Sequence, residues 1–189
     1  LLPTSVMLSS VPVALKAKED NMPMITASGT EESITLVGNN VFRTCFIDPY
    51  QGQLMASYAS KKLNAKTAAI IYDTGDPYST GIADAFETAA KSFGMTITNK
   101  EGYTTKSTDF NTQLTKIKTS NPEVIMVPVY YSDVALIAVQ AKNHGITAKL
   151  LGADGWDSVL DKIDKSDVDA LANGYFCSQY SDTSTDPNL

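Results

Sequence analysis

The sequence contains few of the residues on which metal sites and many hydrolases depend. Its 189 residues include two cysteines, Cys45 and Cys177, and a single histidine, His144. A zinc site usually takes several Cys, His or acidic ligands at short spacings, and the sequence offers no such spacing. A Ser–His–acid triad would have to use His144, and no G-x-S-x-G stretch supplies its serine. We therefore expect neither a metal site nor hydrolase chemistry.

Long apolar runs and clusters of basic residues are missing as well. No apolar run reaches the roughly 18 residues of a membrane-spanning helix. The formal net charge is −6, and the 15 Lys and Arg residues do not cluster among aromatic residues. Nucleic acid is therefore a poor candidate partner. The composition, 43% apolar and 19% charged, is that of a folded globular protein.

The two cysteines and the two chain ends each allow a limited conclusion. Cys45 and Cys177 fit either two unpaired small apolar side chains or a disulfide. The chain has neither an initiator Met nor a signal peptide, and it begins with LLPTS and ends with STDPNL. Neither end resembles a natural domain terminus, so we expect an internal piece of a longer protein.

Short apolar runs alternate with helical patterns from residue 67 onward. The runs at 67–73, 95–103, 123–130 and 148–155 read as strands, and the stretches between them carry apolar residues at helical spacing. This alternation predicts βαβ units and a parallel sheet covered on both faces. Upstream, residues 22–28 and 40–48 read as further extended segments.

Two helices are predicted to begin at an Asp-Pro pair, in which Asp caps the helix and Pro takes its first position. The pairs are Asp48-Pro49 and Asp76-Pro77. The buried faces are predicted to consist of Leu54, Met55, Tyr58 and Ala59 in the first helix, and Ile82, Phe86, Ala89, Ala90 and Phe93 in the second. The predicted plan is a partial unit at 1–45, a fuller α/β unit at 46–175 and an exit segment at 176–189.

The strand–turn–helix at 70–86 raises the question of a phosphate loop. Its Gly75 and Gly81 are not followed by the Lys-Ser/Thr pair of a P-loop, nor are they part of a three-glycine dinucleotide pattern. Asp73 and Asp76 would repel a phosphate. Nucleotide binding is therefore not expected here, and an ordinary capped turn is the simpler interpretation.

Polar and aromatic residues gather where the predicted parallel strands end, which is where open α/β sheets bind ligands. These residues are Ser28, Gly29, Thr30, Tyr78, Tyr130, Tyr131 and Asp154, and Ser5 precedes a helix in the same way. Hydroxyls and free N–H groups suit a carboxylate, and a single acid suits an ammonium. Tyr rings suit an apolar side chain. The combination describes an α-amino acid.

Six segments in order resemble the extracellular branched-chain amino-acid-binding proteins, the type I solute receptors of ABC importers. They are PMITASGTEESIT, VFRTCFIDPYQG, AAIIYDTGDPYSTGIADAF, TDFNTQLTKIK, NPEVIMVPVYYSD and LLGADGWD. The resemblance implies the periplasmic-binding-protein type I fold, with two α/β lobes joined by three crossing segments and a ligand between them. On that template, the chain holds part of lobe one and most of lobe two, and lacks the start of lobe one and its C-terminal return.

The resemblance also implies a cellular role. It implies a binding protein rather than an enzyme, with an amino acid as ligand, no cofactor, and an ABC permease and ATPase as partners. An extracellular or periplasmic location follows, with any lipid anchor to the membrane lying outside this fragment. The alternatives are the same fold binding an amide, an aromatic acid, a purine or a sugar, or a flavodoxin-like enzyme or regulatory domain.

Binding roles carry over residue by residue for the first lobe. Ser5, in TSV, matches a position whose hydroxyl helps to hold the ligand carboxylate. Ser28 and Thr30, in ASGT, match the turn that holds the ammonium and the carboxylate through a backbone carbonyl and a hydroxyl.

For the second lobe, Tyr78 and Tyr130 match aromatic residues that line the cleft. Asp154, in GADG, matches the acid that pairs with the ammonium. Branched-chain members often carry Glu at this position, and the shorter Asp leaves the ligand class less defined. Trp156 and Tyr131 are either additional walls of the cleft or packing residues.

Overall fold

The computed structural model describes residues 6–179, which form two parallel sheets. A two-stranded sheet pairs β1 with β2, and a five-stranded sheet has the order β4-β3-β5-β6-β7. The strands are β1 (Met24–Thr26), β2 (Val41–Arg43), β3 (Thr67–Asp73), β4 (Thr96–Tyr103), β5 (Val124–Met126), β6 (Lys149–Gly152) and β7 (Gly174–Phe176). The predicted α/β class with a parallel sheet is confirmed.

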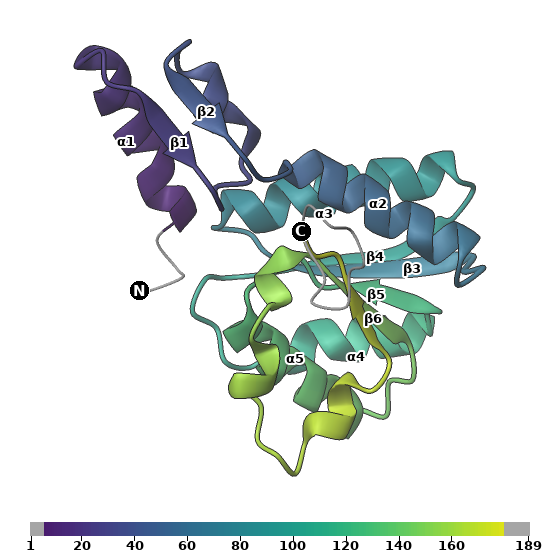
Figure 1. Cartoon of the computed structure of the whole chain (residues 1–189). Coiled ribbons are helices and arrows are strands. Elements are labelled where there is room, and N and C mark those ends of the chain that lie inside the picture. Colours follow the sequence, from purple (N-terminus) through teal and green to yellow (C-terminus); the bar gives the residue numbers. More distant parts are fainter. Residues whose placement is uncertain (1–5, 180–189) are drawn as a thin grey trace, which may run out of the picture.

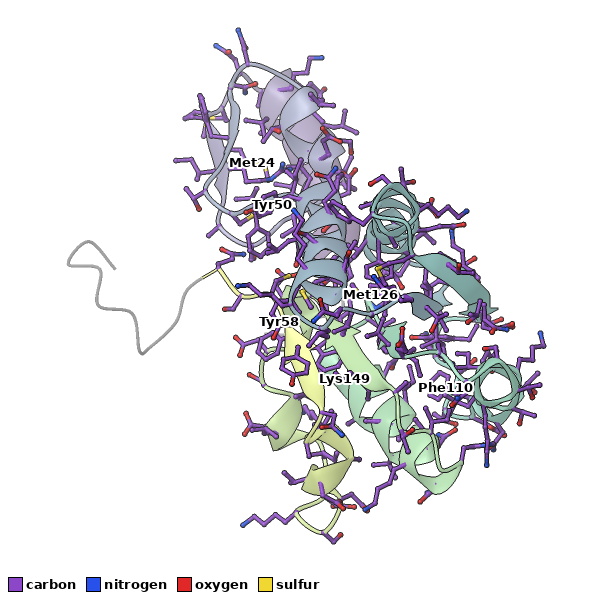
Figure 2. All side chains as sticks on the ribbon, turned by 90° about the vertical axis from the view of Figure 1, so that its right-hand side faces the viewer. Met24, Tyr50, Tyr58, Phe110, Met126 and Lys149 are labelled. Atoms are coloured by element: carbon purple, nitrogen blue, oxygen red, sulfur yellow. The ribbon has the colours of Figure 1, made fainter. Side chains whose placement is uncertain are left out.

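Helices cover both faces of the five-stranded sheet (Figure 1). Helices α2 (Asp48–Lys61) and α3 (Pro77–Ser92) lie on one face, and α4 (Asn111–Ser120) and α5 (Tyr131–Asn143) lie on the other. Successive residues of β3 alternate between the two layers: Ile70 packs toward α2 and α3, whereas Ala69 and Ile71 pack toward α4 and α5. Figure 2 shows the side chains that fill these layers.

The strand order creates a switch point beside β3. From β3 the chain moves to the edge strand β4, and then returns to place β5 on the other side of β3. Ala68, Ala69 and Ile70 of β3 are in register with Val124, Ile125 and Met126 of β5. A crevice opens outside the carboxyl ends of the strands at such a point, because the helices that follow β3 and β5 lie on opposite faces.

The N-terminal unit is smaller and projects from the five-stranded unit (Figure 1). It consists of α1 (Val6–Glu19), the short 3₁₀ helix η2 (Glu32–Leu36), and the β1–β2 pair. Its described core consists of Ala14, Ile34 and Val41. Ile25 and Phe42, which oppose each other across the two strands, are both exposed.

Two residues predicted to be buried are exposed. Leu54 is 40% exposed, because α2 turns a different face to α3, namely Gln51, Gly52, Met55, Ala56 and Ala59. Phe93 is 39% exposed, because it lies past the end of α3, where the Lys61 ammonium stands 5.0 Å from its ring centre. The other predicted core residues of these two helices are buried, or half-buried in the case of Tyr58.

Short 3₁₀ turns connect β6 to β7. They are η3 (Asp154–Trp156), η4 (Val159–Asp161) and η5 (Val168–Leu171). Strand β7 ends at Phe176, one residue beyond the predicted unit boundary at 175. Among residues 6–179, none of the helices combines the length and hydropathy of a membrane span.

Candidate ligand site

Three of the predicted site residues meet at the switch point. Tyr78 lies in the first turn of α3 after β3, Tyr130 directly precedes α5 after β5, and Asp154 opens η3 after β6. The Tyr78 hydroxyl donates a hydrogen bond to Asp154 Oδ1 at 2.7 Å and accepts one from the Gly155 N–H at 2.8 Å. The rings of Tyr78 and Tyr130 are stacked, with centres 4.8 Å apart. The structure therefore places an acid and two aromatic rings together, as predicted from the sequence.

The position of Tyr78 follows from the way α3 begins. Asp76 caps the helix by accepting a hydrogen bond from the Tyr78 N–H at 3.1 Å, and Pro77 takes the first helical position. The Ser79 hydroxyl accepts a hydrogen bond from the Asp73 N–H at 2.9 Å, which ties the first turn back to β3. The predicted Asp-Pro helix start is confirmed here, and it directs the Tyr78 side chain inward, where it is 2% exposed.

Asp48 behaves differently from the cap predicted for it. Residue Ile47 precedes the helix without a capping side chain, and Asp48 is the first residue of α2. Its side chain is 3% exposed, and a hydrogen bond from the Thr30 side chain stabilises its carboxylate. Its backbone N–H donates to the Thr30 carbonyl at 3.0 Å. Thr30 of the N-terminal unit is thus held against the start of α2.

Sequence reasoning missed Gln51, which joins the two carboxylates. Its Nε2 donates to Asp48 Oδ1 at 3.3 Å, and its Oε1 accepts from the Asp154 N–H at 2.9 Å. Gln51 is four residues before Met55 and eight before Ala59, so it falls on the buried face of an amphipathic helix. A polar residue in that register is a signal that the sequence could have supplied.

The carboxylates of this site are poorly solvated. Burial raises the pKa of Asp48 to about 7, and it also raises the pKa of Asp154 above its usual value. Within the described part of the chain, neither carboxylate forms an ion pair with Lys or Arg. Burial raises the pKa of the Tyr78 phenol far above its usual range, so its proton stays in place to bind Asp154. A site of this kind favours a ligand that brings a positive charge.

The remaining predicted residues are placed as follows. Ser28 lies in the turn after β1 with its side chain exposed, and Thr30 is buried. Ser5 lies outside the described residues. Trp156 is buried and donates from Nε1 to the Val127 carbonyl at 2.8 Å, which is a packing role.

The two cysteines are free thiols, and Cys177 is buried. Its Sγ–H donates to Gln51 Oε1 at 3.2 Å, and burial raises the pKa of its thiol to about 12. The described residues contain no cluster of three or more His, Cys, Asp or Glu side chains that could hold a metal ion.

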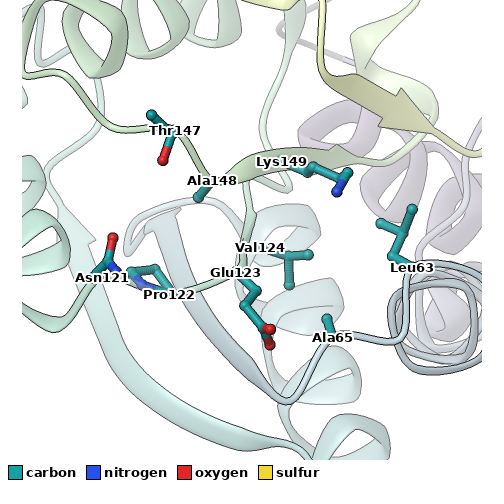
Figure 3. Close-up of a pocket in the computed structure, with 9 residues that line it drawn as sticks. All are labelled: Leu63, Ala65, Asn121, Pro122, Glu123, Val124, Thr147, Ala148 and Lys149. Atoms are coloured by element: carbon teal, nitrogen blue, oxygen red, sulfur yellow. The ribbon is translucent and has the colours of Figure 1, made fainter.

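A separate pocket of about 270 Å³ lies at the opposite end of the five-stranded sheet (Figure 3). Its lining residues precede or begin the strands: Leu63 and Ala65 lie before β3, residues 121–124 lead into β5, and residues 147–149 lead into β6. Glu123 accepts from the Thr67 N–H at 3.0 Å and so fixes the start of β3. This pocket is distant from the switch point, and Glu123 has a structural role in it.

Comparison with known proteins gives a consistent match. A leucine-binding protein LivK from Thermotoga maritima superposes with a TM-score of 0.78 at 32% identity, over 83% of this chain and 45% of that one. The Streptococcus pneumoniae protein LivJ, solved with isoleucine, also gives a TM-score of 0.78, at 27% identity over 95% of this chain and 57% of that one. These matches confirm the predicted type I binding-protein fold.

The sequence relatives agree. Leu/Ile/Val-binding protein homolog 3 of Brucella melitensis is 35% identical over 147 residues, which are 77% of this chain and 40% of that protein. The chain thus spans about 40% of the length of the curated relatives it matches. Residues 4–188 match the profile of periplasmic binding proteins. The chain belongs to the periplasmic binding protein family.

Proposed function

We propose that the full-length protein captures an α-amino acid between two lobes and delivers it to an ABC importer. The observation that carries this proposal is the Asp154 carboxylate at the switch point, held by Tyr78 and lacking an ion-pair partner among the described residues. A ligand ammonium would supply the missing positive charge through a charge-assisted hydrogen bond.

The ligand is expected to have a branched or otherwise apolar side chain. The ring of Tyr130, which is partly exposed and stacked on the buried ring of Tyr78, offers apolar area beside the acid. Relatives named as Leu/Ile/Val-binding proteins support the same class. The N-terminal unit would bind the ligand carboxylate through the turn that contains Ser28 and Thr30.

The mechanism is capture by closure, without a bond being made or broken. The N-terminal unit would hold the backbone end of the amino acid, and the five-stranded unit would add Asp154 and Tyr130 only when the lobes close. The ligand then stabilises the closed state by its differential affinity, and the permease recognises that state. This role places the protein outside the cytoplasmic membrane, in the periplasm or lipid-anchored at the cell surface.

Calorimetric titration of the full-length protein tests the ligand class. We expect leucine, isoleucine or valine to bind. We expect 4-methylpentanoate, which is leucine without its ammonium, to bind at least about 100-fold more weakly, because Asp154 would remain unpaired. Benzoate, an amide, a purine and a sugar serve as competing ligand classes. Binding of one of these with no binding of amino acids would refute the proposal.

Substitution of the acid tests the site itself. Asp154→Ala should weaken leucine binding by about 100-fold or more, because it leaves a desolvated ammonium without its partner. Asp157→Ala is the matched control, since Asp157 is an exposed acid in the same loop, three residues further on. Unchanged affinity in Asp154→Ala would remove Asp154 from the site.

A further inference from the structure

The side chain of Gln51 links three segments that are distant in the sequence. It lies in the first turn of α2 and is 0% exposed. Its Oε1 accepts from the Asp154 N–H at 2.9 Å, across 103 residues, and from Cys177 Sγ at 3.2 Å, across 126 residues. Its Nε2 donates to Asp48 Oδ1 at 3.3 Å. The segments joined are the start of α2, the turn after β6 and the residue directly after β7.

The chemistry of the partners allows only one orientation of this amide. A backbone N–H can only donate, so the oxygen of Gln51 must face Asp154. The NH₂ group then faces Asp48, whose Oδ1 accepts from it at 3.3 Å. The amide therefore fits in one orientation, since turning it over would place its NH₂ group against the Asp154 N–H, donor against donor.

The turn that carries Asp154 is held from two sides. Gln51 holds the Asp154 N–H, and the Tyr78 hydroxyl holds both the Gly155 N–H and the Asp154 carboxylate. A Cβ on Gly155 would lie 2.8 Å from the Tyr78 hydroxyl oxygen and 3.1 Å from the Val129 carbonyl oxygen. This turn is therefore packed closely against Tyr78, and small displacements of its backbone would move the carboxylate.

We propose that Gln51 is a positioning residue for ligand capture, which fixes the backbone of Asp154 so that its carboxylate meets the ligand ammonium. This inference rests on the proposed function. Gln51 is completely buried, so it acts through Asp154 and not by touching the ligand. Through Asp48, which binds Thr30, the same amide also connects the two units that contribute to the site.

The test compares Gln51→Met with Gln53→Met in the full-length protein. Both changes replace Gln by an apolar side chain of similar length in α2, but Gln53 is exposed. Two quantities are measured: the amide hydrogen-exchange rate of residue 154 in the ligand-free protein, by NMR, and the leucine affinity, by calorimetry. In Gln51→Met, exchange at residue 154 should accelerate about tenfold and leucine affinity should fall about tenfold, because the Asp154 N–H loses its acceptor. Gln53→Met should leave both unchanged.

Each other outcome has a definite meaning. Unchanged exchange at residue 154 in Gln51→Met would overturn the proposed contact. Faster exchange with unchanged leucine affinity would show a structural contact only, and would overturn the positioning role. If the wild-type protein binds no amino acid, the proposed function fails. The positioning role in capture then fails with it, while the exchange measurement still decides whether the contact exists.

Discussion

The tripeptide Asp-Pro-Tyr begins a helix at two places in this chain, and the two copies are used differently. At residues 76–78 the Asp stands before the helix and caps it, and the Tyr side chain is 2% exposed. At residues 48–50 the Asp is already the first helical residue and is 3% exposed, and the Tyr side chain is 52% exposed. The aromatic ring is therefore buried in one copy and exposed in the other, while the acid is half-buried in the first copy and fully buried in the second.

A shift of one residue in the helix start accompanies this difference in burial. Tyr78 is the second residue of α3, whereas Tyr50 is the third residue of α2. One residue rotates a side chain by about 100° around a helix axis, because a turn holds 3.6 residues. The N–H of Asp48 is bound to the Thr30 carbonyl, a contact that has no counterpart at Asp76. Contacts from elsewhere in the fold therefore decide which side chain of the same tripeptide is buried.

The two copies should differ most in how much stability is lost when the tyrosine ring is removed. In the 189-residue chain, Tyr78→Ala should lower the free energy of unfolding by about 3–5 kcal/mol, because it empties a buried space and unpairs Asp154 and Gly155. Tyr50→Ala should change it by less than about 0.5 kcal/mol. Urea unfolding monitored by circular dichroism measures both. Equal losses would mean that Tyr50 is covered by another part of the protein.

The two aspartates should differ in their effect on the pH dependence of stability. Asp48 has a pKa of about 7 in the folded protein, raised mainly by burial, against a usual value of 3.8. The folded state then binds the proton more tightly than the unfolded state. The stability associated with Asp48 is therefore highest below about pH 4 and falls as the pH rises to about 7, by up to about 4 kcal/mol in total.

Asp48→Asn should abolish this fall, so that the variant gains stability relative to wild type as the pH rises from 4 to 7. Asp76→Asn should give a smaller difference of the same sign. Burial also raises the pKa of Asp76, and Asn caps a helix about as well as Asp. Free energies of unfolding from urea titrations at several pH values provide the comparison. If the free energies of unfolding of wild type and Asp48→Asn differ by the same amount at every pH in this range, Asp48 is ionised throughout the range and its pKa is not raised.

Much of the fold could be predicted from the sequence because local patterns and tertiary structure agree in most of the five-stranded unit. Strand β3 occupies the predicted residues 67–73, and Ile82 and Phe86 are buried as their spacing predicted. The prediction for α2 was wrong at Leu54, since apolar spacing alone did not show that Gln51 and Gly52 face the interior. A rule that assigns polar residues to the surface cannot locate a buried amide when two of its three partners lie more than a hundred residues away.

The site was predictable to the extent that it follows from topology. Tyr78, Tyr130 and Asp154 meet because parallel strands present their carboxyl ends at one edge. Asp48 was misjudged as a cap because its sequence context is the same as that of Asp76 over three residues. The difference lies in Thr30, eighteen positions earlier in the chain, which no local pattern links to Asp48.

A glycine follows each tripeptide, and replacing the two glycines should give the smallest difference in stability, with opposite signs. Gly52 lies where α2 and α3 touch: a Cβ there would be 2.7 Å from both the Ile82 carbonyl oxygen and the Phe86 nitrogen. Gly81 of α3 has open space, with Asp48 Cβ the nearest atom at 4.0 Å. Gly52→Ala should therefore destabilise the chain by about 1–3 kcal/mol, because helix backbones must move apart.

Gly81→Ala should stabilise the chain by about 0.5–1 kcal/mol, since alanine restricts the unfolded state and fits a helix interior. Thermal and urea unfolding of the two variants side by side measure the opposite signs. Stabilisation by Gly52→Ala would contradict the close approach of α2 and α3. That approach fixes α2 at the depth where Gln51 reaches Asp154, so Gly52→Ala should also accelerate amide exchange at residue 154, whereas Gly81→Ala should not.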